Sequence, residues 1–151
     1  MNHKQTLDNI FSKSIEFLKN VNISPNSCLI FDIDGTIIDY NGNIIEPIMG
    51  ILIYAQRSGI KIILITSRLA NNYSMEYTKN QLDRLNIKYT SLYMKKNITI
   101  DDYDYKRASR KSVKDRGFVT LMSFGDNLWD VYDYKNTTKA EFSGIPVIIP
   151  H

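Results

Sequence analysis

The chain has 151 residues, the usual size of one globular domain. Hydrophobic residues make up 43% and charged residues 23% of it, with a net charge of +3, which is typical of ordinary globular proteins. A single cysteine excludes an intramolecular disulfide, and no apolar run approaches the roughly 20 residues that span a bilayer. We therefore expect a soluble, cytoplasmic protein without a signal peptide or transmembrane segment.

Hydrophobic periodicity and turn residues divide the chain into alternating helices and strands. In chain order they predict a helix over residues 5–21, a strand over 27–31, a hairpin over 36–45, a helix over 47–59, a strand over 60–65, a helix over 70–85, a strand over 87–93, a helix over 106–116, a strand over 118–124, a short helix over 128–134 and a strand over 146–149. Asn41-Gly42 indicates the hairpin turn, because both residue types tolerate a positive φ. Pro47 and Gly59 stand where helices prefer to begin and end.

This alternation predicts a three-layer, Rossmann-like α/β fold, with a mainly parallel five-stranded sheet and helices on both faces. We expect residues 1–151 to form one domain, with an N-terminal amphipathic helix within 1–22 packed on its core. Ligands of such sheets bind beyond the carboxyl ends of the strands. Chemically active residues should therefore directly follow the strands.

Polar clusters do follow the predicted strands. Asp32 and Asp34 come after the first strand, residues 66–68 (Thr-Ser-Arg) after the second and residues 125–130 (Gly-Asp-Asn-Leu-Trp-Asp) after the fourth, while Lys106 begins the intervening helix. Each cluster alone has an ordinary explanation as a turn, a calcium-type loop, a helix cap or a solvated lysine. Two carboxylates at the end of a buried strand are costly to leave unpaired, however, and call for a cation.

The whole set, in this order, resembles the haloacid dehalogenase (HAD) superfamily of phosphatases. The four superfamily motifs match, in turn, Phe31 to Thr36, Ile65 to Arg68, Lys106 with Arg110, and Gly125 to Asp130. The form of the fourth motif is similar to that of the acid-phosphatase branch, subfamily IIIB, which includes the class C enzymes. That class usually has Glu where this chain has Gly35, so the chain departs from the subclass pattern there.

The resemblance implies a Mg²⁺-dependent phosphomonoester hydrolase. Asp32 would attack phosphorus and form an aspartyl-phosphate, and Asp34 would act first as general acid and then as general base. Because a carboxylate is already ionised at neutral pH, Asp32 needs positioning and charge neutralisation rather than a base. The metal would be held by the carboxylates of Asp32 and Asp126 and by the backbone carbonyl of Asp34.

The remaining motif residues would hold the phosphoryl group. Thr66, Ser67 and Lys106 would bind its oxygens, and Lys106 would also neutralise the charge that develops on them. Asp130 would orient Lys106 from behind. Three residues either contact substrate or only tie the loops together, and these are Arg68, Arg110 and Asn127. In the same way, Trp129 either lines the pocket mouth or packs beneath the loop.

The intervals between the motifs leave little room for the cap domain that often selects substrates in this superfamily. Roughly twenty residues separate Asp39 from the second strand, and residues 94–105 are also too few for a domain. We therefore expect a capless enzyme with an open site, which a homodimer partner would complete or a large substrate would reach. The favoured substrates are nucleotide monophosphates or other small phosphomonoesters.

Two further functions remain open. The basic residues within 106–116 and the aromatic Trp129 are compatible with a phosphatase of nucleic-acid ends, since bases stack on aromatic rings. Nucleic acid is nevertheless not the favoured partner, and no membrane partner is expected. The non-enzymatic alternative is a HAD-like binding module that has lost catalysis, against which the intact carboxylates and Lys106 argue.

Overall fold

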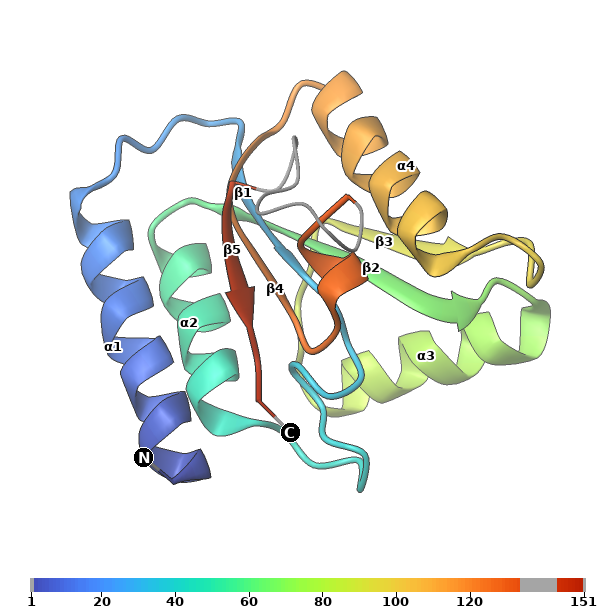
Figure 1. Cartoon of the computed structure of the whole chain (residues 1–151), viewed down its shortest axis with the longest axis horizontal. Helices are drawn as coiled ribbons and strands as arrows, with labels where there is room; N and C mark the ends of the chain where they lie inside the picture. Colours follow the sequence, from blue (N-terminus) through green and yellow to red (C-terminus); the bar gives the residue numbers. More distant parts are fainter. Residues whose placement is uncertain (1, 134–143, 151) are drawn as a thin grey trace.

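The computed structural model describes residues 2–133 and 144–150. Its elements, in chain order, are α1 (His3–Asn20), β1 (Ser27–Phe31), α2 (Glu46–Arg57), β2 (Lys61–Leu69), α3 (Asn72–Arg84), β3 (Ser91–Lys95), α4 (Asp102–Asp115), β4 (Val119–Gly125), the 3₁₀ helix η1 (Leu128–Asp130) and β5 (Ile145–Ile148) (Figure 1). Helices and strands alternate along most of the chain, as the hydrophobic pattern predicts.

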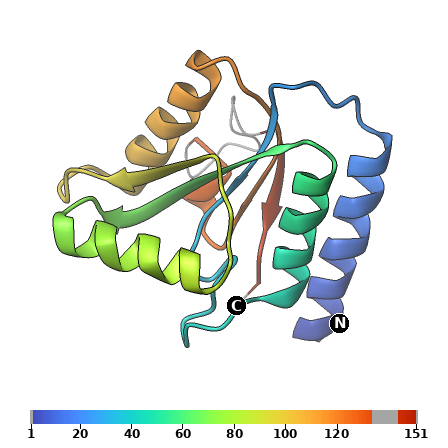
Figure 2. The ribbon, with the colours of Figure 1, turned by 180° about the vertical axis from the view of Figure 1, so that it is seen from behind.

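A parallel five-stranded sheet in the order β3-β2-β1-β4-β5 forms the middle layer. Its central strand, β1, is buried at all five residues, because helices cover both faces. α1 lies beside α2 in both ribbon views (Figures 1 and 2). The structure confirms the predicted three-layer α/β architecture.

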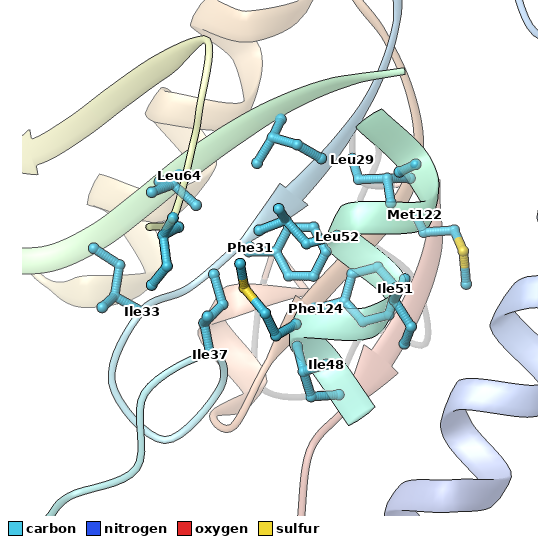
Figure 3. Close-up of a cluster of buried hydrophobic side chains, with 14 of the residues drawn as sticks. Leu29, Phe31, Ile33, Ile37, Ile48, Ile51, Leu52, Leu64, Met122 and Phe124 are labelled. Carbon is cyan, nitrogen blue, oxygen red and sulfur yellow. The ribbon is translucent and has the colours of Figure 1, made fainter. Parts of the chain in front are cut away.

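Side chains of β1 alternate between two apolar cores. Leu29 and Phe31 point into the larger core, where the Phe31 ring stacks on Phe124 of β4 with ring centroids 4.6 Å apart. α2 closes this core with one apolar face (Figure 3). Cys28 and Ile30 point into the smaller core beneath α4. This period-two pattern fixes the register of β1, so the residue after it, Asp32, emerges at the carboxyl edge of the sheet.

The predicted starts of β3 and α4 are each wrong by four residues, for a local reason. β3 begins at Ser91 rather than at residue 87, because Ile87 is buried in the turn after α3, where its N–H donates to the Leu82 carbonyl. α4 begins at Asp102, four residues before the predicted start, because the Asp101 side chain accepts from the Tyr103 N–H and caps it. Acidic residues in the first turn also favour this longer helix.

The predicted hairpin over 36–45, here called the flap, is mostly turn. It contains one antiparallel bridge, between Ile38 and Ile44. The Asp39 carboxylate accepts the N–H groups of Asn41 and Asn43, and Gly42 has φ +85°. The turn therefore forms where the sequence predicts it, but the flanking strands are too short for a ladder.

No cap domain interrupts the fold within residues 2–133 and 144–150. Both intervals where one could be inserted, the flap and the connection from β3 to α4, are short. None of the helices in the described part of the chain is both long and apolar enough to cross a membrane. The predicted short helix over 128–134 is the single 3₁₀ turn η1, and residue 134 lies outside the described residues.

Candidate active site

The polar clusters meet at the carboxyl edge of β1, β2 and β4. The sequence predicts residues 66–68 directly after the second strand, but the structure places them within β2. Ile65 pairs with Tyr93 and Leu69 pairs with Lys95. Between these two pairs, β2 therefore has two more residues than β3. Such a bulge bends the strand locally and redirects its side chains. Thr66 and Arg68 lie within this irregular stretch and line one pocket with Asp32 and Asp34.

Three buried carboxylates form the centre of the site. Oxygen atoms of Asp32, Asp126 and Asp130 lie within 4.8 Å of one another. Lys106, 2% exposed, reaches this cluster from α4. Its Nζ lies 3.0 Å from Asp32 Oδ1 and 2.6 Å from Asp130 Oδ1, and it donates to the Ile65 carbonyl at 2.7 Å. The cluster has the donors to hold a metal ion.

Burial and mutual repulsion set the protonation of this cluster. Burial raises the pKa of Asp32 well above its usual range, and the Asp130 charge raises it further, against the opposing pull of Lys106. Burial alone would lower the pKa of Lys106, but the Asp32 and Asp130 carboxylates raise it above its usual value. Lys106 is therefore charged, and one ammonium does not balance the buried carboxylates. A further cation beside Asp32 would favour its ionised form.

Asp34 points to a different partner. Arg68 Nη2 donates to Asp34 Oδ1 at 2.7 Å and Nε donates to Oδ2 at 2.9 Å. The remaining amino group of Arg68 donates to Thr78 and Gln81 of α3. Arg68 therefore joins α3 to the carboxylate predicted as the acid/base group, and the structure gives it a bracing contact with the site.

A polar pocket of about 310 Å³ opens above these groups. Its lining residues come from the loop after β1, the flap, β2, α4, the loop after β4 and η1, and they are Asp32, Asp34, Tyr40, Thr66, Ser67, Arg68, Asp102, Asn127 and Trp129. The Ser67 hydroxyl donates to Asp102, which also accepts from Lys95. Trp129 lines the pocket, and its ring makes an edge contact with Tyr103 of α4.

Arg110 does not reach this pocket. Its side chain is 1% exposed, and its amino groups donate to the Trp129, Asp130 and Tyr132 carbonyls and to Asp133. These contacts tie α4 to η1 and to the two residues after Val131. Long side chains of α4 are likewise engaged within the protein, because Lys111 pairs with Asp115 and Arg107 with Asp104.

Two polar residues of the pocket were not predicted from the sequence. Tyr40 in the flap donates from its hydroxyl to Asp126 Oδ2 at 2.6 Å, and Asp102 holds Ser67. A tyrosine before a turn and an aspartate near a helix start are common for structural reasons, so no local signal could have found them. Gly35, at φ +75°, lies directly beneath the Tyr40–Asp126 contact.

Comparison with known proteins agrees with this geometry. A family model described as HAD superfamily, subfamily IIIB (acid phosphatase), matches residues 43–146. That match covers more than two thirds of the chain and begins after the Asp32 motif. A search of the curated proteins gave no match.

Two solved structures are similar in fold. A class C acid phosphatase from Bacillus anthracis, with tungstate bound, matches with a TM-score of 0.70 and 16% identity, over 98% of this chain and 77% of that one. A chain of the Pnkp1/Rnl/Hen1 RNA repair complex matches with a TM-score of 0.68 and 21% identity, over 87% of this chain. The match spans only 45% of that longer chain. With the motifs gathered at one sheet edge and the family model matched across most of the fold, the chain belongs to the HAD superfamily, subfamily IIIB, the acid phosphatases.

Proposed function

We propose that the chain is a Mg²⁺-dependent phosphomonoesterase that acts through an aspartyl-phosphate on Asp32. The observation that carries the proposal is the cluster of Asp32, Asp126 and Asp130 around Lys106, since buried carboxylates in excess of their cations need a metal. The available donors are all oxygen atoms, which suits Mg²⁺ better than a softer metal. Asp32, Asp126 and the backbone carbonyl of Asp34 would hold it. When bound, it supplies charge neutralisation to the nucleophile and the phosphoryl oxygens.

In the first step, an Asp32 carboxylate oxygen attacks phosphorus and the bond from phosphorus to the ester oxygen breaks. Asp34 gives a proton to the departing oxygen, which leaves as an alcohol. Lys106 offsets charge on the phosphoryl oxygens, while the Thr66 hydroxyl and the Ser67 N–H hold them in place. Lys106 lies within hydrogen-bond distance of Asp32 and Thr66 lines the same pocket, which supports these roles.

In the second step, water attacks the phosphorus of the aspartyl-phosphate. Asp34, now ionised, takes a proton from this water, and the bond between Asp32 and phosphorus breaks to give inorganic phosphate. The products are one alcohol and one inorganic phosphate, and the cycle ends with Asp32 ionised and Asp34 protonated, as it began. Asn127 and Arg68 would line the path of the substrate, because both face the pocket.

The favoured substrates are small phosphomonoesters, including nucleotide monophosphates. The described residues include no cap domain above the pocket, so it would exclude few leaving groups. A second copy of the chain that completes the open site remains a prediction of the sequence.

A phosphatase of nucleic-acid ends is the second candidate. Trp129 forms part of the pocket wall, where its ring could stack on a terminal base. One structure of similar fold belongs to an RNA repair complex. The engaged side chains on α4 argue against an extended phosphate-binding track there, since Lys106 and Arg110 are both buried.

The test is hydrolysis of an aryl phosphate, a mononucleotide and a terminally phosphorylated oligonucleotide with Mg²⁺ present. We expect turnover of the small substrates, loss of turnover with EDTA, and loss in Asp32→Asn. A strong preference for the oligonucleotide would favour the second candidate. Absence of turnover on all three, with the metal bound, would instead identify a HAD-like binding module.

A further inference from the structure

The flap reaches the carboxylate cluster through one side chain, Tyr40. This residue is 68% exposed, yet its hydroxyl donates to Asp126 Oδ2 at 2.6 Å. A hydrogen bond to a carboxylate at this distance is of the short, charge-assisted kind. In keeping with this contact, the Asp126 hydrogen bond raises the pKa of Tyr40 above its usual value. The ring thus lies in solvent while its polar end is fixed at the site.

Asp126 is held on both of its oxygens. The Tyr40 hydroxyl donates to Oδ2, and the Asn127 side-chain amide donates to Oδ1 at 3.2 Å. Asp126 is only 7% exposed. Two donors on one buried carboxylate restrict its rotation, which is how outer residues orient the ligands of a metal.

Gly35 provides the space for this contact. A Cβ atom at this position would collide with Asp126 Oδ2 and would lie 2.9 Å from the Tyr40 hydroxyl oxygen. The φ of +75° also disfavours any other residue there. The glycine that departs from the usual class C pattern therefore lies where the tyrosine and the aspartate meet.

The flap holds Tyr40 in place by its own hydrogen bonds. The Asp39 carboxylate, directly before Tyr40, accepts the backbone N–H groups of Asn41 and Asn43, which follow Tyr40. Ile45 donates its N–H to the Ile37 carbonyl and closes the base of the flap. The Tyr40 hydroxyl is therefore presented to Asp126 by an ordered turn.

We propose that Tyr40 is a positioning residue for the metal ligand Asp126, and that it couples the flap to metal binding. The inference rests on the proposed function, because it takes Asp126 as a ligand of the divalent cation. Removal of such an outer hydrogen bond weakens metal binding by about 10- to 100-fold in other proteins. We expect a loss in that range for Tyr40→Phe, which removes the hydroxyl and keeps the ring.

The test is titration of the metal-free full chain with Mn²⁺ and with Mg²⁺ by calorimetry. Four proteins are compared, namely the wild type, Tyr40→Phe, Asp126→Asn and Tyr73→Phe. Tyr73 is the matched control, since it is an 81% exposed tyrosine of α3 whose ring stacks on Tyr77. Thermal unfolding of each metal-free protein separates positioning from general stability, because loss of a merely structural contact would lower Tm and leave metal affinity unchanged.

We expect weaker metal binding in Tyr40→Phe than in the wild type. For Tyr73→Phe we expect both the Tm and the metal affinity of the wild type. Equal affinity of Tyr40→Phe and wild type, with binding lost in Asp126→Asn, would overturn this inference and leave the proposed function intact. Tighter binding by Tyr40→Phe would also overturn it, because the hydroxyl would then compete with the metal. Equal binding by Asp126→Asn and wild type would contradict the proposed metal site itself.

Discussion

The guanidinium of Arg68 holds both carboxylate oxygens of Asp34, at 2.7 and 2.9 Å. A planar, two-donor contact of this kind fixes the orientation of a carboxylate as well as its charge. Thr78 and Gln81 hold the far side of the same guanidinium, and both are buried. The side chain proposed as acid/base is thus oriented from α3, through a residue of the bulged end of β2.

Replacement of Arg68 should therefore depend on the leaving group. In Arg68→Met we expect kcat to fall about tenfold or more on an alkyl phosphate, because a misplaced acid no longer protonates the departing oxygen well. An aryl phosphate needs little protonation and should be affected less. Steady-state kinetics on both substrates measure the ratio. Arg107→Met, on α4, is the control, and an equal loss on both substrates would contradict the positioning role.

Removal of Lys106 should destabilise the protein as well as inactivate it. Lys106→Met leaves Asp32 and Asp130 buried without their shared cation, and breaking a buried pair in this way costs about 3–5 kcal/mol. Urea unfolding of the metal-free protein measures this change in the free energy of unfolding. The matched control on the same helix is Lys111→Met, whose exposed pair with Asp115 is worth about 0.2–0.5 kcal/mol. Similar values for the two variants would contradict the buried geometry.

Two glycines separate the cost of backbone conformation from that of crowding. Gly42 has φ +85° and no atom within 4 Å of the place that a Cβ would take, whereas Gly35 has a similar φ and a carboxylate oxygen of Asp126 in that place. Gly42→Ala should cost about 1–2 kcal/mol for its left-handed backbone alone. Gly35→Ala should cost clearly more and weaken metal binding. Denaturant unfolding compares the two, and equal costs would show that the space above Gly35 is not limiting.

Because the Cys28 thiol is buried, we expect the free energy of unfolding to decrease at alkaline pH. Burial raises the pKa of Cys28 from 9.0 to about 11, against a weaker opposing effect of Thr120. Between these values the unfolded chain binds fewer protons at this thiol than the folded chain, so stability decreases as pH rises, by up to about 2–3 kcal/mol. Unfolding at several pH values, compared with Cys28→Ala, measures the slope. A wild-type slope no steeper than that of the variant would contradict it.

Much of the fold follows from patterns within single segments. Residues 28–31 of β1 and the interior of β2 are continuous apolar runs, as expected of strands covered on both faces. The predicted start of β3 is wrong because Ile87 resembles the beginning of a strand, although its burial comes from packing after α3. The extension of β2 to Leu69 depends on pairing with β3, which no local pattern records.

In the candidate site, too, some residues could be predicted from the sequence and others could not. Residues at strand ends, such as Asp32 and Asp126, could be predicted because parallel strands end at one edge. The inward path of Arg110 could not be predicted, since its partners include carbonyls of η1, which is distant from α4 in the sequence. Tyr40 escapes prediction for a similar reason, because its contact with Asp126 joins residues 86 positions apart in the sequence.

Chemical trapping of the aspartyl-phosphate tests covalent catalysis at Asp32 most directly. Borohydride reduces an acyl phosphate, so quenching the enzyme during turnover with Mg²⁺ should convert Asp32 to homoserine, detected by mass spectrometry of its peptide. The proposed function predicts this product only with substrate and metal present, and none in Asp32→Asn. Full turnover by Asp32→Asn, or hydrolysis without any modified Asp32 peptide, would contradict covalent catalysis at this residue.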